Sequence, residues 1–222
     1  MRNGHPRDAQ RARVYRAELP LPPSPLPGLD ACARFADRIV GTLWWHVRFP
    51  HLTLDRLPRL RPGNGARTAF FSETDDGETT ITLPRRYRTK GIVVHELAHW
   101  ALHDQPDLPS HGATFARLML DTTEEFCGAE RAGALAEAYR SERVRIGAAP
   151  RLGPDGQWRY GWDERLRLAR GREVTVRLSG DESEVRGMLE RTERRGSVLV
   201  VRDGDVTQRV PVERVWFVHG AR

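Results

Sequence analysis

The feature that most constrains the fold of this chain is a change in hydrophobic periodicity near Gly147. Before it, apolar residues recur mainly every three to four positions, as they do on one face of an amphipathic helix. After it, apolar and polar residues alternate in short runs, which is typical of half-buried strands. These runs cover residues 173–178, 185–190, 197–202, 206–210 and 215–218. The pattern predicts an α+β chain that ends in a small all-β barrel of the SH3-like or Sm-like kind.

Composition divides the chain further. Residues 1–28 form a basic and Pro-rich N-terminal segment, and the stretch LPLPPSPLPG at 19–28 favours an extended linker because proline lacks a backbone donor. We expect a folded domain over 29–149, a linker over 150–171 and the β-barrel domain over 172–222.

Within 29–149, the sequence predicts helices around a small sheet. A helix begins near Asp30, with Ala31, Phe35 and Ile39 on its apolar face. Strand-like runs near 46–54, 66–72 and 78–83 are separated by turn signals and predict an antiparallel sheet. Further helices are expected over 90–103, from an N-cap at Ser110 to about residue 127, and over 129–145.

The second of these predicted helices carries the motif H-E-x-x-H at residues 95–99. His95 and His99 are one helical turn apart, so their imidazoles can reach the same zinc ion. Glu96 lies beside them and can act as general base toward a metal-activated water. Apart from Glu96, no charged residue occurs between 92 and 100. Burying these polar groups in an apolar helix is costly without a function, which favours a catalytic Zn²⁺ site.

A catalytic zinc usually takes three protein ligands and keeps one position open. His111 is the best candidate for the third ligand, because it follows a short loop and starts a helix that can turn back over the site. Glu124 or Glu125 could supply the ligand from the next helix instead. His103 is a weaker candidate, since three successive turns of one straight helix cannot converge on one ion. Cys32 and Cys127 are too few and too far apart to form a thiolate zinc site.

The residues H-E-L-A-H-W at 95–100, followed by H-G-A-T-F at 111–115, resemble the pattern of SprT-like zinc metalloproteases. The resemblance implies a zincin-like core of helix, short antiparallel sheet, HExxH helix and ligand-bearing helix. It also implies His95, His99 and His111 as zinc ligands, Glu96 as the catalytic base and a protein or peptide substrate. Residues 7–12 and the helix that leads to 145–147 are similar to actinobacterial HExxH metallohydrolases related to SprT. The chain lacks the C-terminal zinc ribbon of SprT proper, because no Cys-x-x-Cys is present.

Two alternative functions stay open. Leu102-His103 fits the active-site helix of ImmA/IrrE-type zincins, which cleave transcriptional repressors. The basic excess in residues 1–90, where 16 basic and 9 acidic side chains occur, instead fits a zincin-fold module that binds nucleic acid or a protein and catalyses weakly. Nothing in the sequence shows that nucleic acid is bound.

The sequence leaves the residue that stabilises the reaction oxyanion open among Tyr87, His103 and Tyr139. The apolar runs are too short to span a membrane. No apolar stretch follows the charged first residues as a secretory signal requires, so we expect a cytoplasmic protein with no membrane partner.

Overall fold

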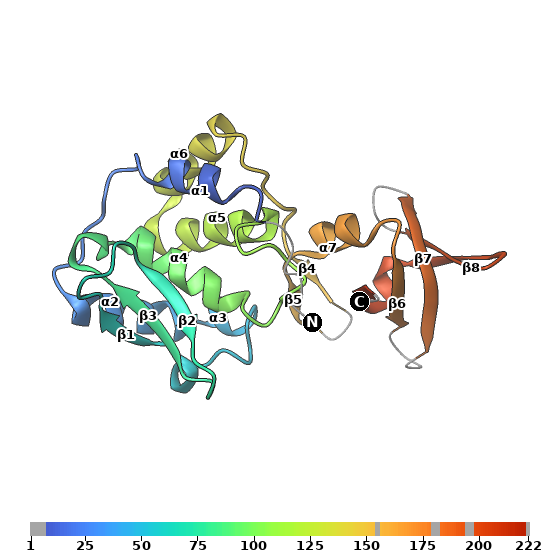
Figure 1. Ribbon diagram of the computed structural model, residues 1–222, viewed down its shortest axis with the longest axis horizontal. Coiled ribbons are helices and arrows are strands. Elements are labelled where there is room, and N and C mark those ends of the chain that lie inside the picture. Colours follow the sequence, from blue (N-terminus) through green and yellow to red (C-terminus); the bar gives the residue numbers. More distant parts are fainter. Residues whose placement is uncertain (1–7, 154–155, 179–182, 194–197, 221–222) are drawn as a thin grey trace. The chain divides into compact units, whose positions relative to one another are not determined.

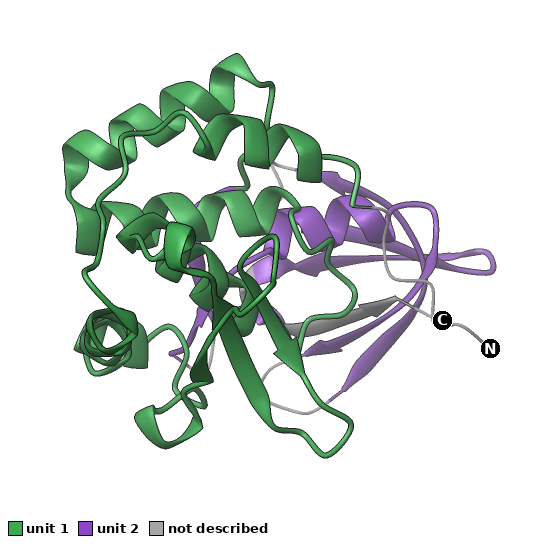
Figure 2. Ribbon diagram, turned by 60° about the vertical axis from the view of Figure 1, so that its left-hand side comes forward, with its two compact units in different colours: residues 1–147 green, residues 148–222 purple. Residues whose placement is uncertain are grey.

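The computed structural model describes residues 8–153, 156–178, 183–193 and 198–220 (Figure 1). Residues 1–7 lie outside the described part, and with them the first residue of the 7–12 motif. The chain divides into two compact units, residues 1–147 and 148–222, which Figure 2 shows in separate colours. No helix of the described residues is long and apolar enough to cross a membrane.

The first unit contains six helices in its described residues. Their bounds are α1 Arg11–Glu18, α2 Leu29–Val40, α3 Leu43–His46, α4 Lys90–Ala101, α5 Ala113–Cys127 and α6 Ala129–Ser141. The helices predicted from periodicity at 30, 90, 110 and 129 are therefore present, although three of them differ at their ends. The second ends at Ala101 rather than 103. The third begins at Ala113 with Gly112 at its N-cap rather than Ser110, and the fourth ends at Ser141 rather than 145.

The small sheet is mixed rather than antiparallel. Its strands are β1 Arg59–Pro62, β2 Phe70–Glu73 and β3 Thr79–Leu83, in the order β1-β3-β2. The chain forms a β2–β3 hairpin, and β1 then pairs with the other side of β3 in parallel. The prediction of a purely antiparallel sheet was wrong because β3 lies between two strands that run in opposite directions.

The strand predicted over 46–54 is also wrong. Its first residue ends the short helix α3, which begins when the Thr42 side chain accepts a hydrogen bond from the Trp45 backbone N–H. Trp45 is fully buried, stacks on Trp100 and donates its indole N–H to the carbonyl of Leu52. This bond closes residues 45–52 into a turn around the indole ring. The apolar residues that suggested a strand therefore pack locally in this turn.

Helix α4 is the centre of the first unit. Thr89 caps it by accepting a hydrogen bond from the backbone N–H of Ile92. Helix α5 and strand β2 pack against it, as Figure 1 shows, and α2 contacts it as well. Eight of its residues are buried, so the motif at 95–99 is held rigidly in the core. Helix α5 passes into α6 at Gly128, whose φ of 96° is a conformation that glycine adopts without a Cβ penalty.

The predicted N-terminal segment is part of the first unit from residue 8 onward. Helix α1 packs on α6, with Val14 and Ala17 buried. The Gln10 side chain bonds both the backbone carbonyl and the N–H of Arg145. The proline-rich stretch then runs extended to α2 and is held beside the start of α4, where the Lys90 N–H donates to the Ser24 carbonyl.

The second unit begins at Ala148, just before the predicted linker of residues 150–171, and includes that linker. The two-stranded β4 Arg151–Leu152 and β5 Trp158–Arg159 and the helix α7 Trp162–Ala169 precede a five-stranded antiparallel sheet. Its strands are β6 Glu173–Leu178, β7 Glu184–Glu193, β8 Val198–Asp203, β9 Val206–Pro211 and β10 Val215–Gly220, in the order β10-β6-β7-β8-β9. Val174, Val176, Leu189, Leu199 and Val201 form one core with residues of α7.

The predicted barrel is not closed. The sheet has β10 and β9 at its two edges, and these edges do not pair with each other in the described residues. The strands were predicted within a few residues of their observed bounds, because alternation reports the buried face of a strand. Closure depends on pairing between strands distant in sequence, about which alternation carries no information.

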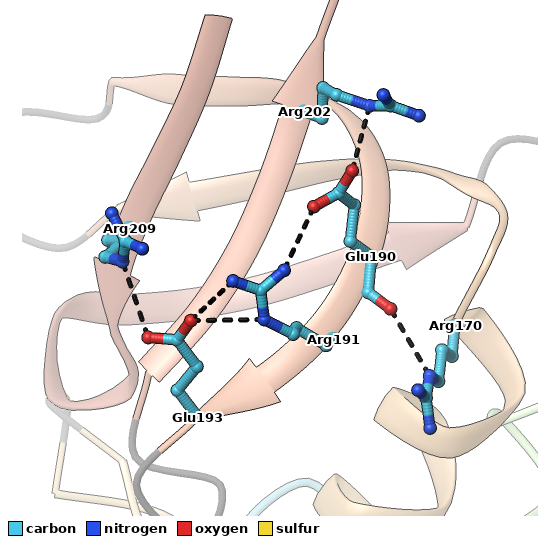
Figure 3. A network of polar contacts seen from close by, with 6 residues as sticks. All are labelled: Arg170, Glu190, Arg191, Glu193, Arg202 and Arg209. Carbon is cyan, nitrogen blue, oxygen red and sulfur yellow. Dashed lines mark hydrogen bonds and ion pairs between the residues drawn. The ribbon is translucent and has the colours of Figure 1, made fainter.

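Alternating charges cover strands β7 to β9 (Figure 3). Glu190 pairs with Arg191 and Arg202, and Glu193 pairs with Arg191 and Arg209. Arg170 donates to the backbone carbonyl of Glu190. Each carboxylate thus contacts two guanidinium groups, so much of the arginine charge of this face is neutralised within the sheet.

Candidate metal centre

Three histidines meet beside α4. His95 and His99 come from the middle of α4, and His111 comes from the turn that precedes α5. One ring nitrogen from each lies within 4.8 Å of the others, so the three could hold one metal ion. His95 and His111 are buried and His99 is half-buried. Phe115, one turn into α5, packs its ring against all three imidazoles.

The loop between α4 and α5 brings the third histidine back. Helix α4 ends at Ala101, and Leu108 is buried in the middle of the returning loop. The Gly112 N–H donates to the Pro109 carbonyl, which closes a turn around His111. The chain therefore reverses within ten residues and places His111 opposite the face that carries His95 and His99.

Two carboxylates fix the orientation of two of these rings. Glu18 Oε2 lies 2.7 Å from His95 Nδ1, and Asp8 Oδ2 lies 2.8 Å from His111 Nδ1. Asp8 also accepts the backbone N–H of His111 at 3.2 Å. A carboxylate at Nδ1 places the ring proton there, so Nε2 keeps its lone pair. Metal-binding histidines are held in this way in many proteins.

The Nε2 atoms of the three histidines are suited to bind a metal cation. His111 Nε2 is buried and has no hydrogen-bond partner, and the Nε2 atoms of His95 and His99 are 3.1 Å apart. An unsatisfied buried acceptor costs about 1–3 kcal/mol. A metal ion among the three nitrogens would remove that cost, and three imidazole nitrogens beside an open pocket are a donor set that suits zinc.

Electrostatics keep two of the rings neutral. Burial, reinforced by the charges of His95 and His111, holds the pKa of His99 well below its usual value. Burial also lowers the pKa of His111, although Asp8 opposes the shift. For His95, burial alone would lower the pKa, but the charge and hydrogen bond of Glu18, with the charge of Glu96, raise it. Neutral imidazole is the form that binds metal, so His99 and His111 are ready for it.

Glu96 is buried next to His95, and its Oε2 has no hydrogen-bond partner. Burial raises the pKa of its carboxyl, against the charge of His95 and a hydrogen bond from the Phe71 backbone. A raised pKa makes the carboxylate a better proton acceptor, as a general base requires.

A pocket of about 790 Å³ opens over the three histidines and Glu96. Its walls include aromatic residues from the sheet side, Phe70 and Phe71, and Tyr15 from α1. A concave, partly apolar pocket with a few convergent polar groups is typical of a ligand site.

The alternative metal ligands do not join the histidine group in the described residues. Glu124 and Glu125 are exposed on α5. His103 lies two residues beyond α4 and bonds Glu73 at 2.6 Å.

The three side chains considered for oxyanion stabilisation lie in different settings. His103 and Tyr87 line the pocket, where Arg86 lies over the Tyr87 ring. Tyr139 is fully buried and donates its O–H to Glu18 Oε1 at 2.7 Å. Tyr139 thus supports the carboxylate that orients His95.

The sequence reasoning missed the contribution of the N-terminal segment. Asp8, Arg11, Tyr15 and Glu18 all line the pocket, although the segment was set apart from the folded domain. Their spacing of three, four and three residues was a usable signal, because it places them along one side of a helix and the turn before it. The overall basic composition of the segment concealed it.

No family model, curated protein or solved structure matches this chain. The assignment of a function therefore depends on the geometry of the site.

Proposed function

We propose that the first unit is a zinc-dependent hydrolase, and more narrowly a metallopeptidase of the SprT-like class. The observation that carries the proposal is the buried group of His95, His99 and His111, with carboxylates on two of the rings and a partnerless nitrogen on His111. The buried Glu96 beside this group supplies the general base that a metal site of structural purpose would not need.

Each residue of the site has a separate role in the proposed hydrolysis. A bound zinc would polarise the scissile carbonyl and lower the pKa of a water molecule. The three histidines would hold the ion, while Asp8 and Glu18 keep their lone pairs directed at it. Glu96 would take a proton from the attacking water and pass it to the leaving amine. The raised pKa of Glu96 suits a group that must both accept and return a proton.

Protein or peptide is the substrate class that fits the pocket best. The pocket is open enough for a chain segment, and its walls offer aromatic and aliphatic side chains beside the site. Amide hydrolysis also uses the proton that Glu96 returns, because an amine leaves only when it is protonated.

The proposal is tested by metal analysis together with a casein or mixed-peptide cleavage assay. The purified protein should hold about one zinc per chain, and Glu96→Gln should keep this zinc and lose cleavage. Glu137→Gln, which changes an exposed carboxylate of α6, is the matched control and should leave both unchanged. Loss of zinc in Glu96→Gln, or full cleavage by it, would overturn the assigned role.

A further inference from the structure

One side of α1 and of the turn before it faces the metal centre. Asp8 and Glu18 lie at its two ends and bond His111 and His95. Arg11 and Tyr15 lie between them at helical spacing, so they belong to the same side. Val14 and Ala17 of the same helix are buried. The two carboxylates therefore fix α1 at both ends and hold Arg11 and Tyr15 over the site.

Tyr15 lies directly on the histidines. Its ring stacks on His95 with centroids 5.6 Å apart and lies 5.1 Å from the ring of His111. Tyr15 is nevertheless 37% exposed, so one edge of the ring faces the pocket. A side chain that touches two of the three histidines and also reaches solvent is within reach of a substrate bound there.

The guanidinium of Arg11 lies beside Tyr15. It is 5.6 Å from the ring centroid and donates a hydrogen bond to the Tyr15 side chain. Its positive charge is near enough to His95 and His99 to work toward lowering the pKa of both. A hydrogen bond received by the Tyr15 oxygen leaves the phenolic proton available for donation.

Arg11 has no carboxylate partner among the described residues. The three carboxylates around the site face other groups: Asp8 bonds His111, Glu18 bonds His95, and Glu96 accepts one hydrogen bond from the Phe71 backbone. The exposed Arg16 of the same helix does pair, with Glu142. An arginine at a metal centre with most of its donors free is suited to bind an anion.

We propose that Arg11 and Tyr15 are the donor pair that holds the oxyanion of the hydrolytic reaction. The inference rests on the proposed hydrolase function. Water adds its oxygen to the scissile carbonyl carbon, Glu96 takes the released proton, and the carbonyl π electrons move onto the carbonyl oxygen. Arg11 and Tyr15 donate hydrogen bonds to that oxygen. When the C–N bond breaks, its electron pair leaves with nitrogen, which receives the proton from Glu96, and the carbonyl re-forms.

Donors of this kind are effective because they are already in place when the negative charge develops. Tyr139 cannot perform this role, because its buried hydroxyl is engaged by Glu18. Arg11 and Tyr15 also come from the same helix that orients the metal ligands, so the donors and the ligands are positioned by one element.

The test uses inorganic phosphate, a tetrahedral oxyanion, as the probe. Its affinity for zinc-loaded protein is measured by calorimetric titration at neutral pH and fixed ionic strength. Arg11→Ala should weaken phosphate binding about 10- to 100-fold, as expected for a charge-assisted hydrogen bond. Tyr15→Phe keeps the ring and should weaken binding about 2- to 10-fold. Zinc content should remain at the wild-type level in both variants.

Arg16→Ala is the control, because it removes the same charge from the outer side of α1 and should leave phosphate affinity unchanged. If Arg11→Ala binds phosphate as tightly as wild type, or if Arg16→Ala weakens binding as much, the inference is wrong. Zinc analysis separates this result from failure of the proposed function, since absence of zinc from the wild-type protein would refute the hydrolase itself. Far-ultraviolet circular dichroism shows whether each variant has kept its fold.

Discussion

Glu18 and His95 are 77 residues apart in the sequence, yet Glu18 Oε2 lies 2.7 Å from His95 Nδ1. The other oxygen of the same carboxylate accepts the O–H of Tyr139 at 2.7 Å. One side chain of α1 thus joins α4 to α6. The first helix is part of the metal centre rather than an appendage of the domain.

Removing the Glu18 carboxylate should weaken zinc binding. We expect Glu18→Ala to lower zinc affinity about 10- to 100-fold, because His95 loses the acceptor that fixes its tautomer and orientation. The affinity is measured by competition with a chromogenic chelator. Glu142→Ala removes a carboxylate that bonds only the outer side of α1 through Arg16, so it should bind zinc as wild type does. Equal affinities for Glu18→Ala and wild type would contradict the role given to this pair.

Tyr139→Phe should lower the stability of the first unit. The substitution leaves one oxygen of the partly buried Glu18 carboxylate without its donor, which costs about 1–3 kcal/mol in the free energy of unfolding. Urea denaturation followed by tryptophan fluorescence measures the change. Tyr87→Phe, at a half-exposed position of the pocket wall, should be nearly neutral. A neutral Tyr139→Phe would show that water replaces the lost donor.

The stabilisation of the protein by zinc can identify the third metal ligand. Saturating zinc, at about 100 times its dissociation constant, should raise the free energy of unfolding by about 2.7 kcal/mol. His111→Ala should lose most of this gain, whereas Glu124→Ala and Glu125→Ala should keep it, because both carboxylates are exposed on α5. Unfolding midpoints with zinc and with a chelator provide the measurement. Retention of the gain in His111→Ala would exclude the three-histidine site.

In the metal-free protein, the free energy of unfolding should decrease as the pH falls. The pKa of His99 in the folded protein lies well below its usual value of 6.5, whereas the unfolded chain titrates near that value. Above about pH 6.5 both states are neutral and His99 contributes nothing. As pH falls below it, only the unfolded state takes up the proton, so the free energy of unfolding decreases.

The contribution of His99 can be isolated in the chelator-treated protein by His99→Gln, which cannot titrate. Between about pH 6.5 and pH 5, the wild type should lose about 1–2 kcal/mol more than this variant, because each pH unit contributes at most about 1.4 kcal/mol. His111 acts in the same direction and His95 in the opposite one, and both are present in the two proteins. Parallel stability curves would mean that His99 does not stay neutral in the folded state.

Gly187→Ala should destabilise the second unit. Gly187 has φ of 145° in β7, and a Cβ there would meet the backbone oxygen of Arg202 in β8 at 2.3 Å. The backbone strain alone costs about 1–3 kcal/mol, and the two strands must also separate to relieve the clash. Gly204→Ala introduces a left-handed alanine in open space and should cost less. The difference between the two thermal unfolding midpoints tests this prediction.

Hydrophobic periodicity predicted the helices and strands of this chain better than it predicted how the strands pair. The periodicity around Val93 and Leu97 correctly predicted the buried helix α4, because a helix in the core must be apolar over most of its surface. The parallel pairing of β1 with β3 and the open sheet of the second unit were missed. Both depend on contacts between segments that are distant in the sequence, which periodicity does not report.

The candidate site was predicted in part for a similar reason. Motif spacing alone brought His95, His99 and Glu96 together, since a helix fixes their relative positions. His111 required a loop that returns, and the structure places it in the same group. Asp8 and Glu18 could not be found from spacing to the motif, because 77 or more residues separate each from the histidine that it bonds.

The bond between Gln10 and Arg145 joins residues that are 135 positions apart, at the two ends of the first unit. Helix α1 is synthesised before the other helices of this unit, but its docking surface on α6 is complete only after nearly the whole unit has been made. Contacts of such large separation form late, because the closure of a long loop must be offset before they contribute. Until the histidines have been made, the carboxylates of Asp8 and Glu18 have no imidazole to bond. The carboxylates of Asp8 and Glu18 are therefore held against the histidines only after α6 has been made and α1 has packed on it.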